Sequence, residues 1–249
     1  MIVAEIGLNH MGDYKAAKDY VNFLVDTEVD AITFQVREQS FYLKDARSHL
    51  KLNKKVYYET SKIAAKFKKK FGLALSDSSL ILELDQQVDF YKILSKDFNY
   101  NFIDNFLRQT NKPLYISTGL NSMESIVSVL ERLTDEDRSR ISLIHTQLSN
   151  TVESVNLKSL GFLKNLSCGS VSFGNHCEDH RVCFMSLCYG PKAIFAYVKK
   201  DDQSVYPDDK HAIMLEDFGD FCKDIKKLKN AIGSGAKVKM SNSIGGQNE

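Results

Sequence analysis

MIVAEIGLNHMGD, residues 1–13, is an apolar run that ends at a glycine and passes into a polar turn. A short apolar run bounded by turn residues predicts a buried β-strand over residues 2–7. After the turn, Asp13 can cap a helix over residues 13–27, whose apolar side chains recur with the period of an amphipathic helix. The chain therefore opens with one strand–turn–helix unit.

The same unit repeats along the chain. Seven further apolar runs of strand length follow, at residues 31–35, 73–76, 90–94, 114–118, 141–146, 170–175 and 193–198. Amphipathic segments separate them, most clearly at residues 122–133 and 216–232, and Gly72 and Gly233 stand where we expect helices to end.

Eight such units without a Pro-, Gly- or Ser-rich linker predict an α/β fold, a single (β/α)8 TIM barrel over residues 1–233. An open doubly wound sheet is the alternative. Residues 234–249 lose the apolar period, and we expect a linker-like or disordered tail there.

The composition argues against several classes of protein. With 33 basic and 32 acidic residues the formal net charge is +1, which favours binding to neither nucleic acid nor an anionic membrane. We expect the basic stretch at 66–70 to be the solvated end of a helix. No apolar run approaches the roughly 20 residues of a membrane-spanning helix, and no signal peptide is evident. The five cysteines are odd in number and lack C-x-x-C spacing, so we expect reduced thiols in a cytoplasmic protein that binds small molecules.

Enzymes with this barrel place their chemistry on the loops that follow the strands. Polar residues at these positions are therefore the first candidates for a site. They are Asn9 and His10 after the first strand, Gly119 and Asn121 after the fifth, His145, Gln147 and Asn150 after the sixth, and Asn175 and His176 after the seventh.

Several stretches also form a recognisable series. In chain order they are AEIGLNHMGD (4–13), VDAITFQ (29–35), YKILS (91–95), KPLYISTGLNSMESI (112–126), SLIHT (142–146), VNLKSL (155–160), VSFGNH (171–176), AIFAYVKKD (193–201) and YPDDK (206–210). Together they resemble the barrel motifs of the sialic acid synthase family, including its K-F-Q, L-L-H-C-T and G-Y-S-D-H segments. The family's C-terminal antifreeze-like domain has no counterpart in these 249 residues.

The resemblance implies a reaction. Members of the family condense phosphoenolpyruvate with the open aldehyde form of an N-acylated mannosamine-type sugar, giving a nonulosonic acid and phosphate. Such chemistry requires an electropositive pocket, a divalent metal (Mn or Mg) that polarises the aldehyde, and general acid–base groups. The implied partners are the sugar and phosphoenolpyruvate, with a homodimer or association with another glycan enzyme.

The matching positions give the expected site. By resemblance, Glu5 and His10 are the expected catalytic residues, and His176 is the expected metal ligand. The expected substrate-binding residues are Asn9, Lys92, Ser95, Ser117, Thr118, Glu124, His145, Asn150 and Asp208. Purely structural roles are the alternatives: a buried ion pair for Glu5, and helix capping for His10, for residues 117–122 and for Glu124.

The sequence also departs from the family pattern. Thr33 replaces the lysine of K-F-Q, and the loss of a charge-assisted bond costs about 1.5–3 kcal/mol. Gly174 and Asn175 replace a serine and an aspartate, and Tyr197 replaces the second metal-binding histidine. In the loop after the sixth strand, residues 148 and 150 are Leu and Asn in place of an amide or hydroxyl and a tyrosine. His211 or Asp209 can rebuild a metal site.

Three functions are compatible with this pattern. The first is a divergent synthase of the family type. The second is a non-catalytic sugar-binding or regulatory barrel that assembles with another glycan enzyme. The third is a different reaction on a related sugar acid, such as a metal-independent cleavage or isomerisation with Glu5 and His10 as acid and base.

Overall fold

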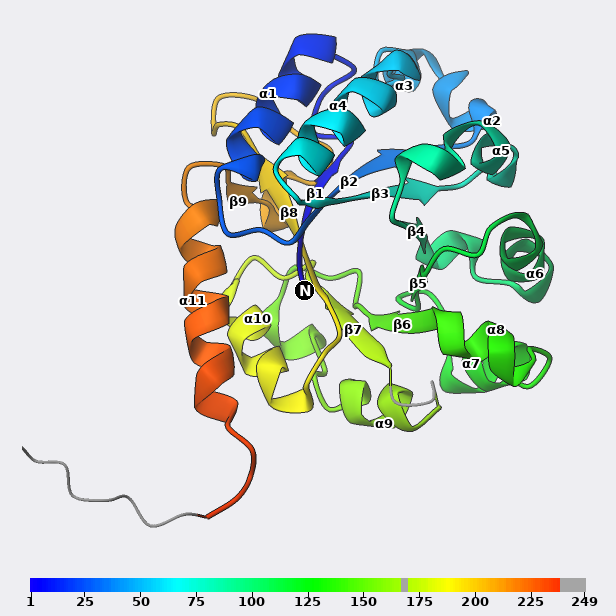
Figure 1. Cartoon of the computed structure of the whole chain (residues 1–249), viewed down its shortest axis with the longest axis vertical. Coiled ribbons are helices and arrows are strands. Elements are labelled where there is room, and N and C mark those ends of the chain that lie inside the picture. Colours follow the sequence, from blue (N-terminus) through cyan, green and yellow to red (C-terminus); the bar gives the residue numbers. More distant parts are fainter. Residues whose placement is uncertain (167–169, 238–249) are drawn as a thin grey trace, which may run out of the picture.

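The computed structural model describes residues 1–166 and 170–237, and its centre is a closed barrel of eight parallel strands (Figure 1). Each strand pairs with the next along the chain, and β1 also pairs with β8, which closes the barrel. The strands are β1 (Ile2–Gly7), β2 (Ala31–Val36), β3 (Lys70–Leu75), β4 (Phe90–Ile93), β5 (Leu114–Ser117), β6 (Ile141–His145), β7 (Val171–Gly174) and β8 (Ile194–Lys199). The predicted (β/α)8 barrel is confirmed.

Helices surround the barrel (Figure 1). They are α1 (Tyr14–Val25), α2 (Gln39–Tyr42), α3 (Asp45–Ser48), α4 (Lys55–Lys66), α5 (Ile81–Leu84), α6 (Tyr100–Gln109), α7 (Met123–Leu130), α8 (Asp135–Arg140), α9 (Ser159–Leu166), α10 (Arg181–Ser186) and α11 (Phe218–Ile232). The Asp13 side chain accepts a hydrogen bond from the Ala16 N–H at 2.8 Å, so the predicted cap of α1 is confirmed. Gly233 ends α11 with a φ of +64°, as its position suggested.

Alternation along the strands builds two cores. Side chains such as Ile2, Ala4 and Ile6 belong to the outer core, between the strands and the helices. The intervening positions point into the barrel, where seven buried residues form a plug: Val3, Ala31, Phe90, Tyr115, Ile144, Ala193 and Phe195. The Tyr115 ring packs edge-on against Phe90 and Phe195, with centroids 5.3 and 5.2 Å apart. The plug fills the barrel below the carboxyl ends of the strands, and the inward-facing hydroxyls of Ser142 and Ser172 at its level are bonded to each other at 2.9 Å.

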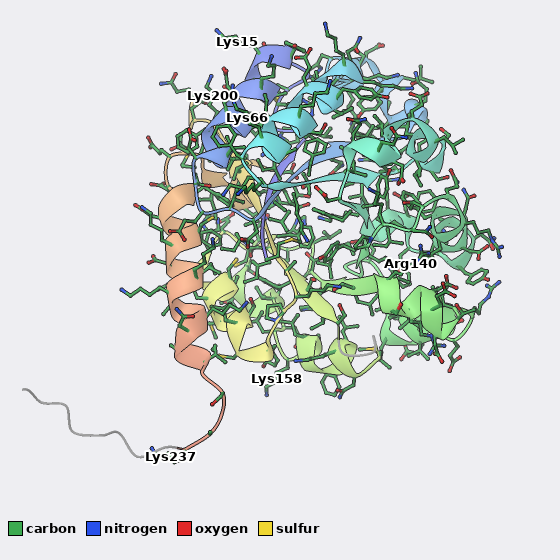
Figure 2. All side chains as sticks on the ribbon, in the orientation of Figure 1. Lys15, Lys66, Arg140, Lys158, Lys200 and Lys237 are labelled. Carbon is green, nitrogen blue, oxygen red and sulfur yellow. The ribbon has the colours of Figure 1, made fainter. Side chains whose placement is uncertain are left out.

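Two predictions around β3 need correction. Gly72 does not end a helix but lies inside β3, which begins at Lys70 rather than at residue 73. A Cβ atom at Gly72 would lie 2.4 Å from the Phe90 ring, so the glycine makes room for the plug. The basic stretch at 66–70 spans the turn between α4 and β3, with Lys68 at a φ of +58°, rather than a helix end alone. Lys66 points outward with other basic side chains such as Lys15 and Lys158 (Figure 2).

A short extra strand, β9 (Ile213–Met214), was not predicted. It pairs with the end of β8 through Val198↔Ile213 and Lys199↔Met214. Two residues are too few for a sequence pattern, yet this pairing holds the loop 200–212 against the carboxyl end of the barrel.

Three of the described cysteines are buried and Cys188 is exposed, and all four are free thiols. Among the residues that the structure describes, no helix is long and apolar enough to cross a membrane. Residues 234–237 form neither helix nor strand, whereas the rest of the expected tail, 238–249, and Cys168 lie outside the described residues.

Candidate active site at the carboxyl end of the barrel

Directly above the plug lies a second layer of inward-facing positions, here called the upper layer. Its members are Glu5, Thr33, Lys92, Ser117, Thr146, Gly174 and Tyr197. The register places Glu5 beside Thr33 on one side and beside Tyr197 on the other. Three of the polar residues that the sequence singled out, Glu5, Lys92 and Ser117, therefore face the inside of the barrel towards its carboxyl end.

A buried ion pair dominates the upper layer. Lys92 Nζ lies 2.5 Å from Glu5 Oε1, and the two side chains are 5% and 4% exposed. The same ammonium lies 5.1 Å from the Phe195 ring centroid and 5.8 Å from that of Tyr197, within the range of cation–π attraction. Lys92 is thus held by a carboxylate and two rings in a region of low dielectric, where Glu5 compensates its charge.

Tyr197 and Asp208 meet beneath the end of β1. Burial, together with the charges of Glu5 and Asp208, raises the pKa of Tyr197 well above its ordinary value, so this phenol stays neutral. Gly7 has a φ of +57°, and a Cβ atom there would lie 2.8 Å from the Tyr197 ring and 2.9 Å from Asp208 Oδ2. Glycine at this position is what allows both side chains to reach the centre.

Asp208 belongs to the loop after β8 and is held by Asn9. The Asp208 N–H donates to Asn9 Oδ1 at 3.1 Å, and Asn9 Nδ2 donates to the Val198 carbonyl at 2.8 Å. Both ends of the Asn9 amide are therefore used inside the protein. Burial and the nearby charge of Glu5 raise the pKa of Asp208 to about 7, so this carboxyl group exchanges its proton near neutral pH.

Two imidazoles lie beside Tyr197. The His176 and His211 ring centroids are 4.4 Å apart, and each is within 5.4 Å of the Tyr197 ring. Burial, with contributions from neighbouring positive groups, lowers the pKa of His176 to about 2 and that of His211 to about 4, so both rings are neutral. Asn150 Nδ2 donates to the His176 carbonyl at 2.8 Å and faces His211 Nδ1 at 3.4 Å.

Asn150, His176, Asp208 and His211 contribute to a cavity of about 450 Å³ at the carboxyl end, here called the mouth cavity. Its lining is Leu148, Asn150, His176, Val205, Tyr206, Pro207, Asp208, Asp209, Lys210 and His211. A small sugar fits a space of this size.

The residues do not fit a manganese or magnesium site built from protein ligands. In the described part of the chain, no three His, Cys, Asp or Glu side chains are placed to share one metal ion. The predicted ligand His176 has a neutral phenol, Tyr197, at the second imidazole position, and hard cations require several oxygen ligands. His211 does come close to His176, but the planes of the two rings are only 30° from parallel. The Asp209 carboxylate is already bound to Lys199 at 3.0 Å.

Hydroxyl groups cluster where β4 and β5 end. Ser95 Oγ and Ser117 Oγ lie 2.8 Å apart, and the Gly119 N–H donates to Ser95 Oγ at 3.1 Å. The Thr118 hydroxyl is used inside the protein, because it donates to the Ile144 carbonyl at 2.9 Å. The Gly119 N–H and one of the two serine O–H groups are used within this cluster, which leaves one serine O–H free to donate to an anion.

Three predicted site residues lie elsewhere. Glu124 is exposed in the first turn of α7, where Ser122 and a backbone N–H lower its pKa, so the capping alternative describes its position. The His145 ring points into the outer core and bonds to the Val155 carbonyl at 2.8 Å. His10 Nδ1 accepts from the Gly12 N–H at 2.9 Å, and burial lowers the pKa of His10 to about 4.

Sequence reasoning missed two members of the site. Thr146 is buried in the upper layer, and Gly7 provides the space for Tyr197 and Asp208. The period-2 alternation of β6 was the available signal for Thr146, because Ile144 faces inward and residue 146 follows on the same side.

Comparison with known proteins yields one family and several relatives. A family model described as "NeuB family" matches residues 18–237. An uncharacterised protein of Methanocaldococcus jannaschii is 26% identical over 249 residues, covering 96% of this chain and 74% of its own length. An N,N'-diacetyllegionaminic acid synthase of Campylobacter jejuni is 24% identical, covering 95% and 78%. The crystal structure of an N-acetylneuraminic acid synthetase from Leptospira borgpetersenii, in complex with citrate, superposes with a TM-score of 0.87 at 19% identity, covering 97% and 87%.

Proposed function

Because this chain belongs to the NeuB family, we propose that its upper layer and mouth cavity join phosphoenolpyruvate to the open aldehyde form of an N-acylmannosamine-type sugar. The product is a nonulosonic acid for glycan biosynthesis, released together with phosphate. One observation carries the proposal: the buried Lys92–Glu5 pair lies in the same layer as Ser117, whose hydroxyl meets that of Ser95.

Phosphoenolpyruvate binds on the side of β4 and β5. The Lys92 ammonium attracts its negative charges, and the O–H group that the contact between Ser95 and Ser117 leaves free donates to one of its oxygens. Glu5 shares the same ammonium, and Thr33 offers no second cation, so we expect weaker donor binding than a lysine at residue 33 would give.

The aldose lies in the mouth cavity, where Asn150 and Asp208 contact its polar groups. C3 of the donor attacks the aldehyde carbon, and the aldehyde oxygen takes a proton. Asp208, with a pKa of about 7, is partly protonated at neutral pH and supplies that proton. Water then adds to C2 of the donor and gives one proton to Glu5. The C2–O bond to the phosphate breaks and the remaining hydroxyl proton passes to the phosphate, which leaves the 2-keto acid.

A non-catalytic sugar-binding barrel is the second candidate. It is favoured by the joint change at two neighbours of Glu5: Thr33 lacks the cation of the family motif and Tyr197 lacks the imidazole. In this role the mouth cavity would still bind a sugar, and the chain would act with another glycan enzyme.

Phosphate release tests the proposal. Purified protein is incubated with phosphoenolpyruvate and a panel of N-acylmannosamine derivatives, with Mn²⁺, Mg²⁺ or EDTA, and phosphate and 2-keto acid are both measured. We expect one phosphate per keto acid, loss of both with Glu5→Gln, and no change with the surface variant Glu83→Gln. If no sugar in the panel releases phosphate, the synthase is rejected.

The double variant Thr33→Lys with Tyr197→His separates the two candidates. A non-catalytic barrel stays inactive after both replacements, whereas a lightly modified enzyme gains activity.

The location and assembly follow as part of the same proposal. We propose a cytoplasmic protein, because the donor is a cytoplasmic metabolite and the four described cysteines are free thiols. A homodimer or an association with another glycan enzyme is tested by light scattering of the purified chain, alone and with candidate enzymes.

A further inference from the structure

The inward face of β7 lacks a side chain at its last position, Gly174. A Cβ atom there would lie 2.9 Å from Ile144 Cγ2, 3.5 Å from Thr146 Cβ and 3.6 Å from Thr146 Oγ1. Two residues of the neighbouring strand β6 therefore occupy the space in which a side chain of residue 174 would stand. The serine hydroxyl of the family's S-D-H motif has no counterpart on β7.

Thr146 brings a hydroxyl to this place from β6. Its side chain is 3% exposed, and Oγ1 has no hydrogen-bond partner among the residues that the structure describes. A buried hydroxyl without a partner costs about 1–3 kcal/mol. The neighbouring hydroxyls of Ser95, Ser117 and Thr118 all have partners. An unsatisfied hydroxyl beside Ser95 and Gly174 indicates a position that a ligand completes.

The surroundings of Thr146 indicate which ligand group it meets. The Cβ atom that Gly119 lacks would lie 2.7 Å from Thr146 Cγ2 and 3.2 Å from Ser95 Oγ, so Thr146 and Ser95 are adjacent. Thr146 thus lies beside Gly119 and Ser95, and it lines a separate cavity of about 150 Å³ with Thr118 and Gly119 rather than the mouth cavity. Hydroxyl donors on this side suit the oxygens of an anion.

The two changes belong together. Residues 143–147 resemble the family's L-L-H-C-T, so Thr146 stands in place of a cysteine while Gly174 stands in place of a serine. Relative to the family motifs, β7 lacks a hydroxyl at residue 174 and the neighbouring chain segment after β6 has an additional one at residue 146. The two positions are in contact. We propose that Thr146 is a donor-binding residue whose hydroxyl contacts an anionic oxygen of phosphoenolpyruvate, in place of the hydroxyl absent at Gly174. The identity of this ligand rests on the proposed function.

Four variants test the assignment. Thr146→Val keeps the shape and removes the hydroxyl, and Thr146→Ser keeps the hydroxyl. The triple variant Ile144→Leu, Thr146→Cys, Gly174→Ser returns the hydroxyl to β7 and removes the Ile144 branch that a side chain at residue 174 would meet. Thr60→Val is the matched control, because Thr60 is a buried threonine whose hydroxyl donates to Val56 within α4. Circular dichroism establishes that each variant is folded.

Calorimetry gives the Kd for phosphoenolpyruvate, and phosphate release gives kcat and the KM of each substrate. Loss of a hydrogen bond to a charged group weakens binding roughly ten- to hundredfold, so Thr146→Val raises the Kd and KM for phosphoenolpyruvate by at least about tenfold. The KM for the sugar stays within about twofold. Thr146→Ser, Thr60→Val and the triple variant bind the donor within about threefold of the parent.

The assignment is overturned if Thr146→Val binds phosphoenolpyruvate as tightly as the parent, or if the triple variant binds as weakly as Thr146→Val. A parent that binds phosphoenolpyruvate without releasing phosphate rejects the proposed function alone, because the Kd values still decide the role of Thr146. A parent that releases phosphate and is matched by Thr146→Val rejects the Thr146 assignment alone. A parent without affinity for phosphoenolpyruvate overturns both.

Discussion

Lys92 and Glu5 form an ion pair inside the barrel although they are 87 residues apart in sequence and β2 and β3 lie between their strands. Both side chains are nearly inaccessible to water. Each charge therefore depends on the other for compensation, and removal of either one leaves an unpaired charge in a region of low dielectric.

The first prediction concerns the stability of this pair. Glu5→Gln or Lys92→Met lowers the free energy of unfolding by about 3–5 kcal/mol, whereas the double variant regains most of that loss because no charge is left alone. Urea unfolding measures all three. The exposed pair Lys54–Glu83 is the control, and Lys54→Met costs at most about 1 kcal/mol. Equal effects at the two pairs would show that the buried pair is solvated.

The second prediction concerns Asp208. If it is the general acid, kcat falls as the pH rises through about 7, and Asp208→Asn reduces kcat at least about a hundredfold. A kcat that is independent of pH between 6 and 8 would assign the proton to another group.

Asp208 also affects stability, with a defined sign. The folded state keeps the proton between the ordinary pKa of 3.8 and about 7, so this group lowers the free energy of unfolding as the pH rises through that window. Asp208→Asn removes this effect. The variant is therefore more stable than the parent at pH 8, by about 1–4 kcal/mol, and the difference shrinks towards pH 4.

The third prediction concerns His10, whose effect on the free energy of unfolding changes with pH in the opposite direction to that of Asp208. Its pKa is lowered from 6.5 to about 4, so the unfolded chain binds the proton first. The stability contributed by neutral His10 is complete above pH 6.5 and is lost as the pH falls towards 4, by about 3 kcal/mol in total. Urea midpoints at pH 7, 6, 5 and 4 should fall less steeply for His10→Gln than for the parent. Parallel curves would place a charged His10 in the folded state.

The fourth prediction concerns Tyr197. Tyr197→His adds an imidazole beside those of His176 and His211, and the His176 ring centroid lies 5.4 Å from that of Tyr197. We expect Mn²⁺ to bind at least about tenfold more tightly, as read from the electron paramagnetic resonance signal of free Mn²⁺. His176→Gln in the same background should abolish the gain. If affinity does not change, the two positions do not converge on one ion.

The fold was largely predictable because the eight barrel strands and the longer helices each follow a local sequence pattern. β1 and α1 are an apolar run and an amphipathic run separated by a cap at Asp13. The role of Gly72 was predicted wrongly because a glycine is needed there to make room for the Phe90 ring, which belongs to another strand. Contacts between strands leave no local signal.

The site was predictable only in part, for the same reason. The resemblance identified Glu5 and Lys92 one by one, but their pairing depends on barrel closure. His145 and Thr146 are neighbours in sequence and point to opposite sides of β6, so the polar residue that the motif emphasised faces the outer core, and the one it passed over lies in the upper layer. Alternation decides between them once the strand register is known.

The pairing of β1 with β8 has a consequence for how the protein matures on the ribosome. β1 emerges first, but its partner β8 is made about 190 residues later, so Glu5 and Tyr197 become neighbours only when nearly the whole barrel has been synthesised. Contacts so distant in sequence close slowly and late. A chain interrupted before β8 therefore exposes two sheet edges and has no assembled site. We expect such a chain to bind no ligand, and binding to appear all at once when β8 has been synthesised.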